Sequence, residues 1–258
     1  VMHLFGMPPD TDRLLQRAVQ GGVACVVSPL GEATIGPYRR PVLVDRLARW
    51  LRGLPVTRLA AAVAGCTSAE EAALRAQRVH RRVELLPLGV AESDFAAPPA
   101  ARGSAGRTLL VLRPLHPIDG PLALLKALAD LGPAADGWQI VFGGPAVGDW
   151  RLQLEAGVRR KGAADRVRFE PSDDPATHRR LLGQASLVVS PSLHHRGDTS
   201  VAMAVAAGVP VVTTSFTAPP LPDGAIRVCS PRREDLATAL HDLLTASQAE
   251  LIRQGGAA

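Results

Sequence analysis

The second half of the chain alternates short apolar runs with longer stretches of helical periodicity, and this alternation limits the fold more than any other feature. Runs of strand length occur at Thr108–Leu112, Gln139–Phe142, Arg166–Phe169, Ser186–Ser190, Val209–Thr213 and Ile226–Val228. Helical spacing is found at Pro121–Leu131, Trp150–Lys161, Pro175–Gln184, Thr199–Ala207, Arg233–Leu244 and in a terminal segment that ends near Arg253. Strands and helices in this order require right-handed crossovers, which place the strands in one parallel sheet covered by helices.

The first half follows the same rhythm over a shorter length. Strands are predicted at Val1–Phe5, Val23–Ser28, Leu59–Gly65 and Val83–Leu86, and helices at Asp10–Gln20, Val42–Leu54 and from Thr67 to Arg78. Val1 lies inside an apolar run, as if earlier strands of this half were missing. Residues 91–106 are rich in Ala, Pro, Gly and Ser, as linkers are. We therefore expect a truncated Rossmann-like domain at 1–98, a linker at 99–106 and a complete Rossmann-like domain with a terminal helix at 107–258.

Charge and composition narrow the classes of partner. The formal net charge is +5, but the charges are interspersed and aromatic residues make up only 3% of the chain. Nucleic-acid binding favours a continuous basic stripe with aromatic side chains between the cations, so we expect no nucleic-acid partner. A modest attraction for anionic ligands is the expected consequence of the charge.

Cysteine usage and hydropathy point to the cytoplasm. The three cysteines are far apart in apolar runs, which predicts buried thiols and neither a disulfide framework nor a metal site. No apolar run approaches the ~18 residues of a membrane span, and the first residues lack the basic start of a signal peptide. We expect a cytoplasmic protein, and work at the inner face of the membrane stays open as an alternative.

The segment Ser190–Val212 is where we expect a ligand. It reads as the end of a buried strand, a polar loop through Asp198, a helix of small residues and a further buried strand. In an open α/β sheet such a loop lies at the carboxyl end of its strand, and the N-terminus of the next helix offers unpaired N–H groups to an anion. The segment therefore predicts an anion-binding crevice.

Six segments in a fixed order carry a resemblance to a known family. They are Gly22–Gly31, Leu86–Val90 followed by Phe95, Leu115–Gly120, Phe142–Pro145, Ala164–Phe169 and Ser190–Val212. In this order they resemble the glycosyltransferase family 4 members of the GT-B fold, over nearly the whole chain. The resemblance implies two Rossmann-like parallel-sheet domains with the N-terminal one truncated, and transfer of a sugar from a nucleotide-diphosphate donor with retention. It implies a glycan or lipid-linked acceptor hydroxyl, and neither a metal nor a separate cofactor.

The resemblance also implies positions for the site. On the donor side these are Arg113, Gly120, Gly143, Phe169, His195, Arg196, Gly197, Asp198, Thr199 and Met203, with His195 as the candidate catalytic residue. On the acceptor side they are Gly6 and Gly31. Backbone N–H groups of the loop before the small-residue helix are expected to meet the phosphates.

The charged residues of the family pattern are replaced in this chain. The family's diphosphate-binding Arg and Lys fall on Pro114 and Asp119, and its two Glu fall on His195 and Met203. Proline cannot donate a hydrogen bond, aspartate repels phosphate and methionine is a weak acceptor. The alternative to an active enzyme is therefore an inactive homologue that serves as a binding or partner subunit.

Several of these residues have two interpretations. Arg113 could replace the lost Arg, although a shift of one residue along a strand turns a side chain to the other face. His195 and Arg196 could contact phosphate or sugar, or be solvated loop residues. Asp198 is a preferred N-cap residue and would compete with phosphate for the same N–H groups.

Met203 fits core packing as well as a site. The basic helix face of Arg46, Arg49 and Arg52 is either solvated or in peripheral contact with anionic lipid.

Overall fold

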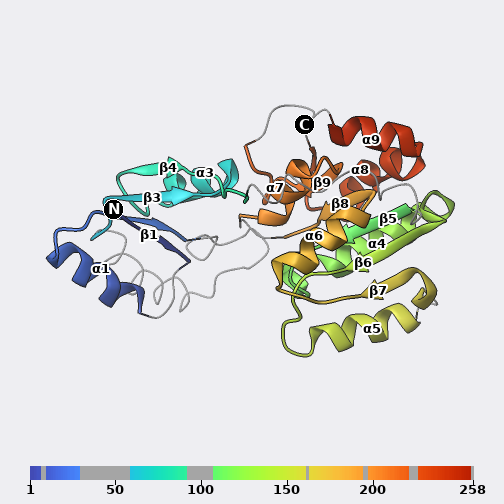
Figure 1. Cartoon of the computed structure of the whole chain (residues 1–258), viewed down its shortest axis with the longest axis horizontal. Coiled ribbons are helices and arrows are strands. Elements are labelled where there is room, and N and C mark those ends of the chain that lie inside the picture. Colours follow the sequence, from blue (N-terminus) through green and yellow to red (C-terminus); the bar gives the residue numbers. More distant parts are fainter. Residues whose placement is uncertain are drawn as a thin grey trace. The chain divides into compact units, whose positions relative to one another are not determined.

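A computed structural model describes residues 1–6, 10–29, 59–91, 107–160, 163–193, 197–220 and 226–256. These residues form two compact units, one within residues 1–88 together with Gly197, and one within residues 89–193 and 198–258 (Figure 1). The division falls ten residues before the predicted end of the first domain at 98. The linker predicted at 99–106 and the helix predicted at Val42–Leu54 lie outside the described residues.

The first unit is built on a parallel sheet. Among its described residues four strands pair in the order β1-β2-β3-β4: Met2–Phe5, Cys25–Ser28, Ala62–Gly65 and Val83–Leu85. Helix α1 (Thr11–Gln20) connects β1 to β2, and α3 (Ser68–Ala76) connects β3 to β4. Leu15 of α1 packs on Cys25 and Val27, and Leu74 of α3 packs on Val63 and Val83.

Helix α3 begins with the cap that its sequence predicts. The Thr67 hydroxyl accepts a hydrogen bond from the Glu70 N–H at 3.0 Å. The Glu70 carboxylate turns back and accepts from the N–H of Cys66 at 2.8 Å, one residue earlier than in a standard capping box. Both side chains are buried, so this cap fixes the entry to α3 from the carboxyl end of β3.

The second unit has the doubly wound topology. Its described strands form a six-stranded parallel sheet in the order β10-β9-β8-β5-β6-β7. The strands are β5 (Arg107–Val111), β6 (Trp138–Phe142), β7 (Val167–Phe169), β8 (Leu187–Ser190), β9 (Val211–Thr214) and β10 (Arg227–Cys229). The helices are α4 (Pro121–Leu131), α5 (Trp150–Arg160), α6 (Pro175–Gln184), α7 (Thr199–Ala206), α8 (Arg233–Thr245) and α9 (Gln248–Gly256). Numbered from β5, the spatial order is 3-2-1-4-5-6, and the direction of winding reverses between β5 and β8.

Two apolar layers hold this sheet between its helices. One contains buried residues of α4, α5, α8 and α9, among them Leu124, Leu154 and Leu240. The other contains buried residues of α6 and α7, among them Leu181 and Val201. Helices cover both faces, as the connection order of a doubly wound sheet requires (Figure 1). The terminal helix α9 packs on this same unit through Leu251.

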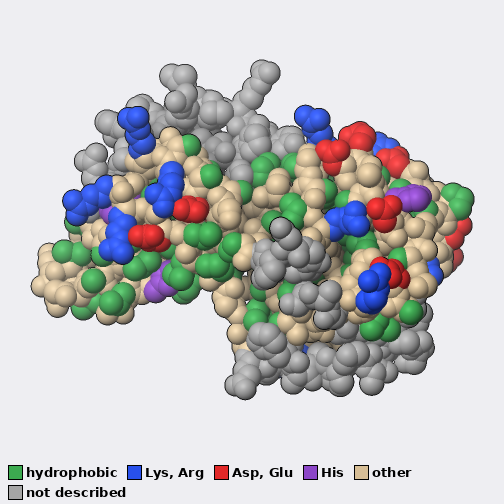
Figure 2. Space-filling model, turned by 90° about the horizontal axis from the view of Figure 1, so that it is seen from above, with side chains coloured by type: hydrophobic (Ala, Val, Ile, Leu, Met, Phe, Trp, Pro, Cys, Tyr) green, Lys and Arg blue, Asp and Glu red, His purple; other side chains and the backbone are tan. Residues whose placement is uncertain are grey.

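Surface charges are mixed. On the face drawn in Figure 2, the described Lys and Arg side chains are interspersed with Asp and Glu side chains. Exposed ion pairs such as Arg233 with Asp130 and Arg180 with Glu170 account for part of this mixture. None of the helices in the described part of the chain is long and apolar enough to cross a bilayer.

Candidate functional site

The strand order of the second unit indicates where on the sheet a ligand would bind. Open α/β sheets bind ligands beyond the carboxyl ends of their strands, at the point where the winding direction reverses. Here that point lies between β5 and β8. The residues that follow these two strands, 112–120 after β5 and 191–193 and 198 after β8, therefore form the candidate site.

The loop after β5 is shaped by a short 3-10 helix at Pro117–Asp119 and by Gly120. Gly120 has a φ of 78°, in the left-handed region that favours glycine. A Cβ atom at this position would lie 1.9 Å from the carbonyl oxygen of Pro191. The main chains of the two loops are thus in direct contact, and the N–H of Leu193 donates to the Ile118 carbonyl at 2.8 Å.

Asp198 ends the loop after β8 and caps α7, as its sequence position predicts. Its Oδ1 accepts from the N–H of Ser200 at 2.9 Å and from the Ser200 hydroxyl at 2.5 Å. Its Oδ2 accepts from the hydroxyl of Ser190 at the end of β8. The side chain of Asp198 is only 3% exposed. A buried carboxylate therefore already lies at the helix N-terminus where we expected an anion.

Arg113 joins the two loops. Its guanidinium donates through Nη2 to Asp119 Oδ1, and its Nη1 lies 3.7 Å from Asp198 Oδ2. The Arg113 side chain is only 6% exposed. Burial lowers the pKa of this guanidinium, but the attraction of Asp198 and of Asp119 outweighs burial and raises the pKa above its ordinary value. Two carboxylates face one cation, so the cluster carries one formal negative charge.

Hydroxyl groups extend this cluster. Thr217 Oγ1 lies 3.3 Å from Ser190 Oγ and 2.8 Å from Thr213 Oγ1. Thr214 Oγ1 donates to the carbonyl of Ser192 at 2.7 Å. These residues come from the ends of β8 and β9 and from the segment after β9, so the edge of the sheet is polar beneath the loops.

Four further donor-side residues lie near the ends of β6, β7 and β8 or at the start of α7. Gly197 is half-buried directly before Asp198, and Thr199 is exposed at the start of α7. Gly143 follows β6, where a Cβ atom would lie 2.5 Å from Leu181 Cδ1. Phe169 stacks on Phe142 at a centroid distance of 5.3 Å at the end of the edge strand β7.

Met203 is 9% exposed and packs in the α6–α7 core layer, which agrees with its packing interpretation. His195 and Arg196, and Gly31 on the acceptor side, lie outside the described residues, as do Arg46, Arg49 and Arg52.

In the first unit, Gly6 follows β1 with a φ of 77° and donates its N–H to the Ser28 carbonyl at 2.8 Å. His3 Nε2 lies 2.9 Å from Ser28 Oγ, and burial lowers the pKa of His3 below its ordinary value. The sequence interpretation passed over both side chains. Their strands, β1 and β2, were predicted, and pairing of adjacent parallel strands is the signal that brings them together.

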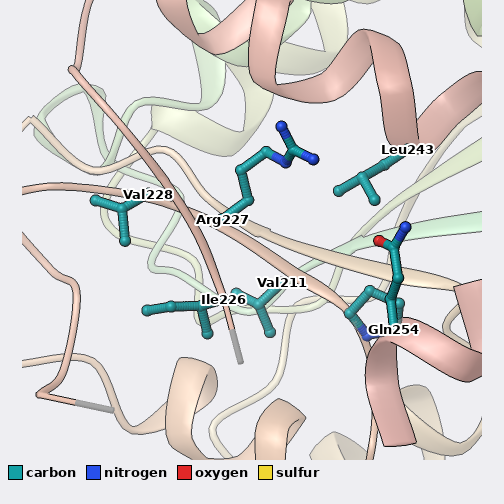
Figure 3. A pocket seen from close by; sticks show the side chains of 7 residues that line it. Val211, Ile226, Arg227, Val228, Leu243 and Gln254 are labelled. Atoms are coloured by element: carbon teal, nitrogen blue, oxygen red, sulfur yellow. The ribbon is translucent and has the colours of Figure 1, made fainter. Parts of the chain in front are cut away.

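A cavity of about 360 Å³ lies elsewhere in the second unit. Val211, Ile226, Arg227, Val228, Leu243 and Gln254 line it (Figure 3). Val211 starts β9 and Arg227 starts β10, so the cavity is at the amino ends of these strands. It is therefore not part of the site at the carboxyl edge. Among the described residues no group of three or more His, Cys, Asp or Glu side chains is arranged to hold a metal ion.

The burial of the cysteine thiols can be tested by their reactivity. The pKa of Cys66 is raised to about 11, mainly by burial and to a lesser extent by the Glu70 carboxylate. The pKa of Cys229 is also raised to about 11, mainly by burial and to a lesser extent by Asp235. Cys25 and Cys66 are buried, as predicted, whereas Cys229 is only partly buried. Because the thiolate is the reactive form, Cys66 is expected to resist iodoacetamide at pH 8 in the folded protein and to react in urea. Mass-spectrometric mapping of the alkylated cysteines checks this, and fast labelling of folded Cys66 would contradict it.

Comparison with known proteins places the second unit in a family. The family model described as "Glycosyl transferases group 1" matches residues 106–246, more than half of the chain. A search of curated proteins finds no match.

Solved structures with the same fold cover almost the whole chain. Sucrose-phosphate synthase from Thermosynechococcus elongatus is 20% identical with a TM-score of 0.78, over 98% of this chain and 66% of that one. HepE from Anabaena in complex with UDP and glucose is 16% identical with a TM-score of 0.71, over 98% and 71% of the two chains. A UDP-forming trehalose-phosphate synthase from Burkholderia xenovorans in complex with glucose-6-phosphate is 15% identical with a TM-score of 0.74, over 98% and 68%.

These likenesses show the fold, which is GT-B, as the resemblance implied. The chain spans about two thirds of the length of these relatives.

Proposed function

Because the chain belongs to the glycosyl transferases group 1 family, we propose that it transfers a sugar from a nucleotide-diphosphate donor to an acceptor hydroxyl. The observation that carries this proposal is the extent of the family match. It spans residues 106–246 and so includes both loops at the switch point, from Arg113 to Asp198. UDP is the first nucleotide to test, because two of the similar structures are described as binding or forming it.

The chemistry of such a transfer needs positive charge at the leaving group. As the bond between sugar and diphosphate breaks, negative charge develops on the phosphate oxygens, and preorganised donors stabilise it. In this chain the N-terminus of α7, Arg113 and Arg196, which precedes α7 in the sequence, are the groups proposed for that task. His195 is proposed to contact the sugar. Gly120 contributes by allowing close approach of the Pro191 main chain, and Gly143 by leaving room for the side chains of Leu112 and Leu181.

The acceptor is proposed to bind in the first unit, near Gly6 and Gly31. Ser28 at the carboxyl end of β2 lies close to Gly6 and to the His3 ring of β1, and a sugar hydroxyl can exchange hydrogen bonds with such groups. A glycan or lipid-linked acceptor, retention of configuration and transfer without a metal belong to the same proposal. So does work in the cytoplasm or at the inner face of the membrane.

A second candidate is a homologue that binds a partner or ligand without transfer. The observation that favours it is the buried pair of carboxylates around Arg113, since Asp119 stands where the resemblance implies a Lys. Such a protein would keep the scaffold residues of the site and lack the charge that departure of a diphosphate requires.

Calorimetric titration with UDP, GDP and their sugars separates the two candidates. A transferase is expected to give saturable heat with one nucleotide and its sugar, at concentrations up to millimolar. The same donor should then release free sugar or a glycosylated acceptor, which mass spectrometry detects. A folded chain that gives no heat with any donor would rule out the transferase proposal in favour of the second candidate.

A further inference from the structure

At the switch point the main chains of two loops are in direct contact. The loops after β5 and β8 meet where Gly120 approaches Pro191, and the Leu193 N–H to Ile118 carbonyl bond fastens them. A ligand at this edge would contact the groups that these loops turn toward each other. Those groups are Arg113, Asp119 and Asp198.

Asp198 makes the contacts that a bound anion would make at the same place. Anions bind at helix N-termini by accepting from free N–H groups, and they pair with nearby guanidinium groups. Asp198 accepts from the N–H of Ser200 at the start of α7 and faces the guanidinium of Arg113 at 3.7 Å. It also accepts hydrogen bonds from the hydroxyl groups of Ser190 and Ser200.

One nitrogen of the Arg113 guanidinium lacks a hydrogen-bond partner among the described residues. This atom, Nε, is buried, although both Nη atoms face carboxylates. Leaving a buried charged donor unpaired is costly, and a buried polar group without a partner calls for an explanation. An external anion that reaches Arg113 would satisfy this donor. The unpaired Nε is therefore an independent sign that the cluster accepts a ligand.

We propose that Asp198 is an internal anion that competes with a ligand phosphate for Arg113 and for the N-terminus of α7. The cluster is thus an autoinhibitory contact: a diphosphate binds only when Asp198 gives up these partners. This inference rests on the proposed function in so far as the ligand is the diphosphate of a sugar donor. It predicts that removal of the Asp198 charge strengthens phosphate binding.

The test compares Asp198→Ser with the unchanged chain and with Asp174→Ser. Serine keeps the N-cap hydrogen bond and removes the charge. Asp174 is a matched control, because it caps α6 through the N–H groups of Ala176 and Thr177 but is exposed and is not one of the described carboxylates that pair with Arg113. Inorganic pyrophosphate and UDP are titrated into each protein by calorimetry. Asp198→Ser is expected to bind pyrophosphate about tenfold more tightly, the gain of one charge-assisted hydrogen bond.

The outcomes separate this inference from the proposed function. Unchanged pyrophosphate affinity in Asp198→Ser, or an equal gain in Asp174→Ser, would overturn the inference. Tighter pyrophosphate binding without any nucleotide binding would support the inference and contradict a nucleotide-sugar donor. Equal UDP affinity in the unchanged chain and in Asp198→Ser would support the donor and contradict the inference. If circular dichroism shows that Asp198→Ser is unfolded, Asp198→Asn replaces it, since asparagine is also a preferred N-cap residue and removes the same charge beside Arg113.

Discussion

Replacing Arg113 with Met is expected to lower the free energy of unfolding by about 3–5 kcal/mol, the usual cost of breaking a buried ion pair from one side. Asp119 and Asp198 would both remain buried without their cation, and each side chain is only 3% exposed. Methionine fills much of the same space. The loss of stability therefore comes mainly from the missing positive charge and not from a cavity. Urea denaturation followed by far-UV circular dichroism measures it.

The matched control is Arg151→Met. Arg151 pairs with Glu155 at 2.7 Å, four residues apart on α5, but the Arg151 side chain is 42% exposed. Solvent screens such a pair, and its loss is expected to cost only about 0.5 kcal/mol. Similar small losses in both variants would show that the Arg113 cluster does not stabilise the fold, and would also weaken the assignment of Asp198 as its internal anion.

The elements of the second unit could be predicted because each carries its own local signal. Helices α4 and α6 have the predicted bounds, since Pro at the first position and a change of periodicity at the end mark them. Strand ends were less certain. β5 begins at Arg107 and stops at Val111, one residue earlier than predicted at each end, because pairing with β6 and not hydropathy sets its limits.

The side chains of the site were harder to predict than its location. The expectation that Arg113 faces away from the site assumed that it continues the alternation of a strand. Since β5 ends at Val111, residue 113 lies outside the pleat, and its guanidinium turns toward the loops. The alternation of strands and helices does predict that the loops of β5 and β8 share an edge. It contains no information on which side chains meet there, because the partners Arg113 and Asp198 are far apart in sequence and their contact depends on the tertiary fold.

The capping role of Asp198 was predictable because it depends on neighbouring residues. Its ion pair with Arg113 was not predictable, because the two residues are far apart in the sequence. An N-cap depends on the next three residues, and Asp before a helix signals it directly. The pairing of Arg113 with Asp119 had a usable signal as well: both belong to one short loop between β5 and α4. From the sequence, Asp119 is interpreted only as the replacement of the family's Lys. Its role as the partner of Arg113 follows from the geometry of the loop.

Gly120→Ala is expected to be the second large loss of stability, and it tests whether the two loops form one rigid structure. A left-handed φ costs a non-glycine residue about 1–2 kcal/mol. In addition, the new Cβ atom would lie 1.9 Å from the Pro191 carbonyl oxygen and 2.7 Å from its carbon. Main-chain atoms cannot avoid this clash by a rotamer change, so the loops must separate, at a further cost of about 1–3 kcal/mol. Thermal or urea denaturation measures the total.

Gly137→Ala provides the control, because Gly137 has a φ of 76° but nothing within 4 Å of an added Cβ atom. Its free energy of unfolding should fall only by the cost of the left-handed φ. The difference in free energy of unfolding between the two variants then measures the contact between the loops. Separation of the loops also removes the Leu193 to Ile118 hydrogen bond, which holds Asp119 near Arg113. Equal losses in the two variants would mean that the loops move apart at no cost. The contact between the loops would then not restrict entry of a ligand, and competition by Asp198 alone would have to account for weak binding of phosphate.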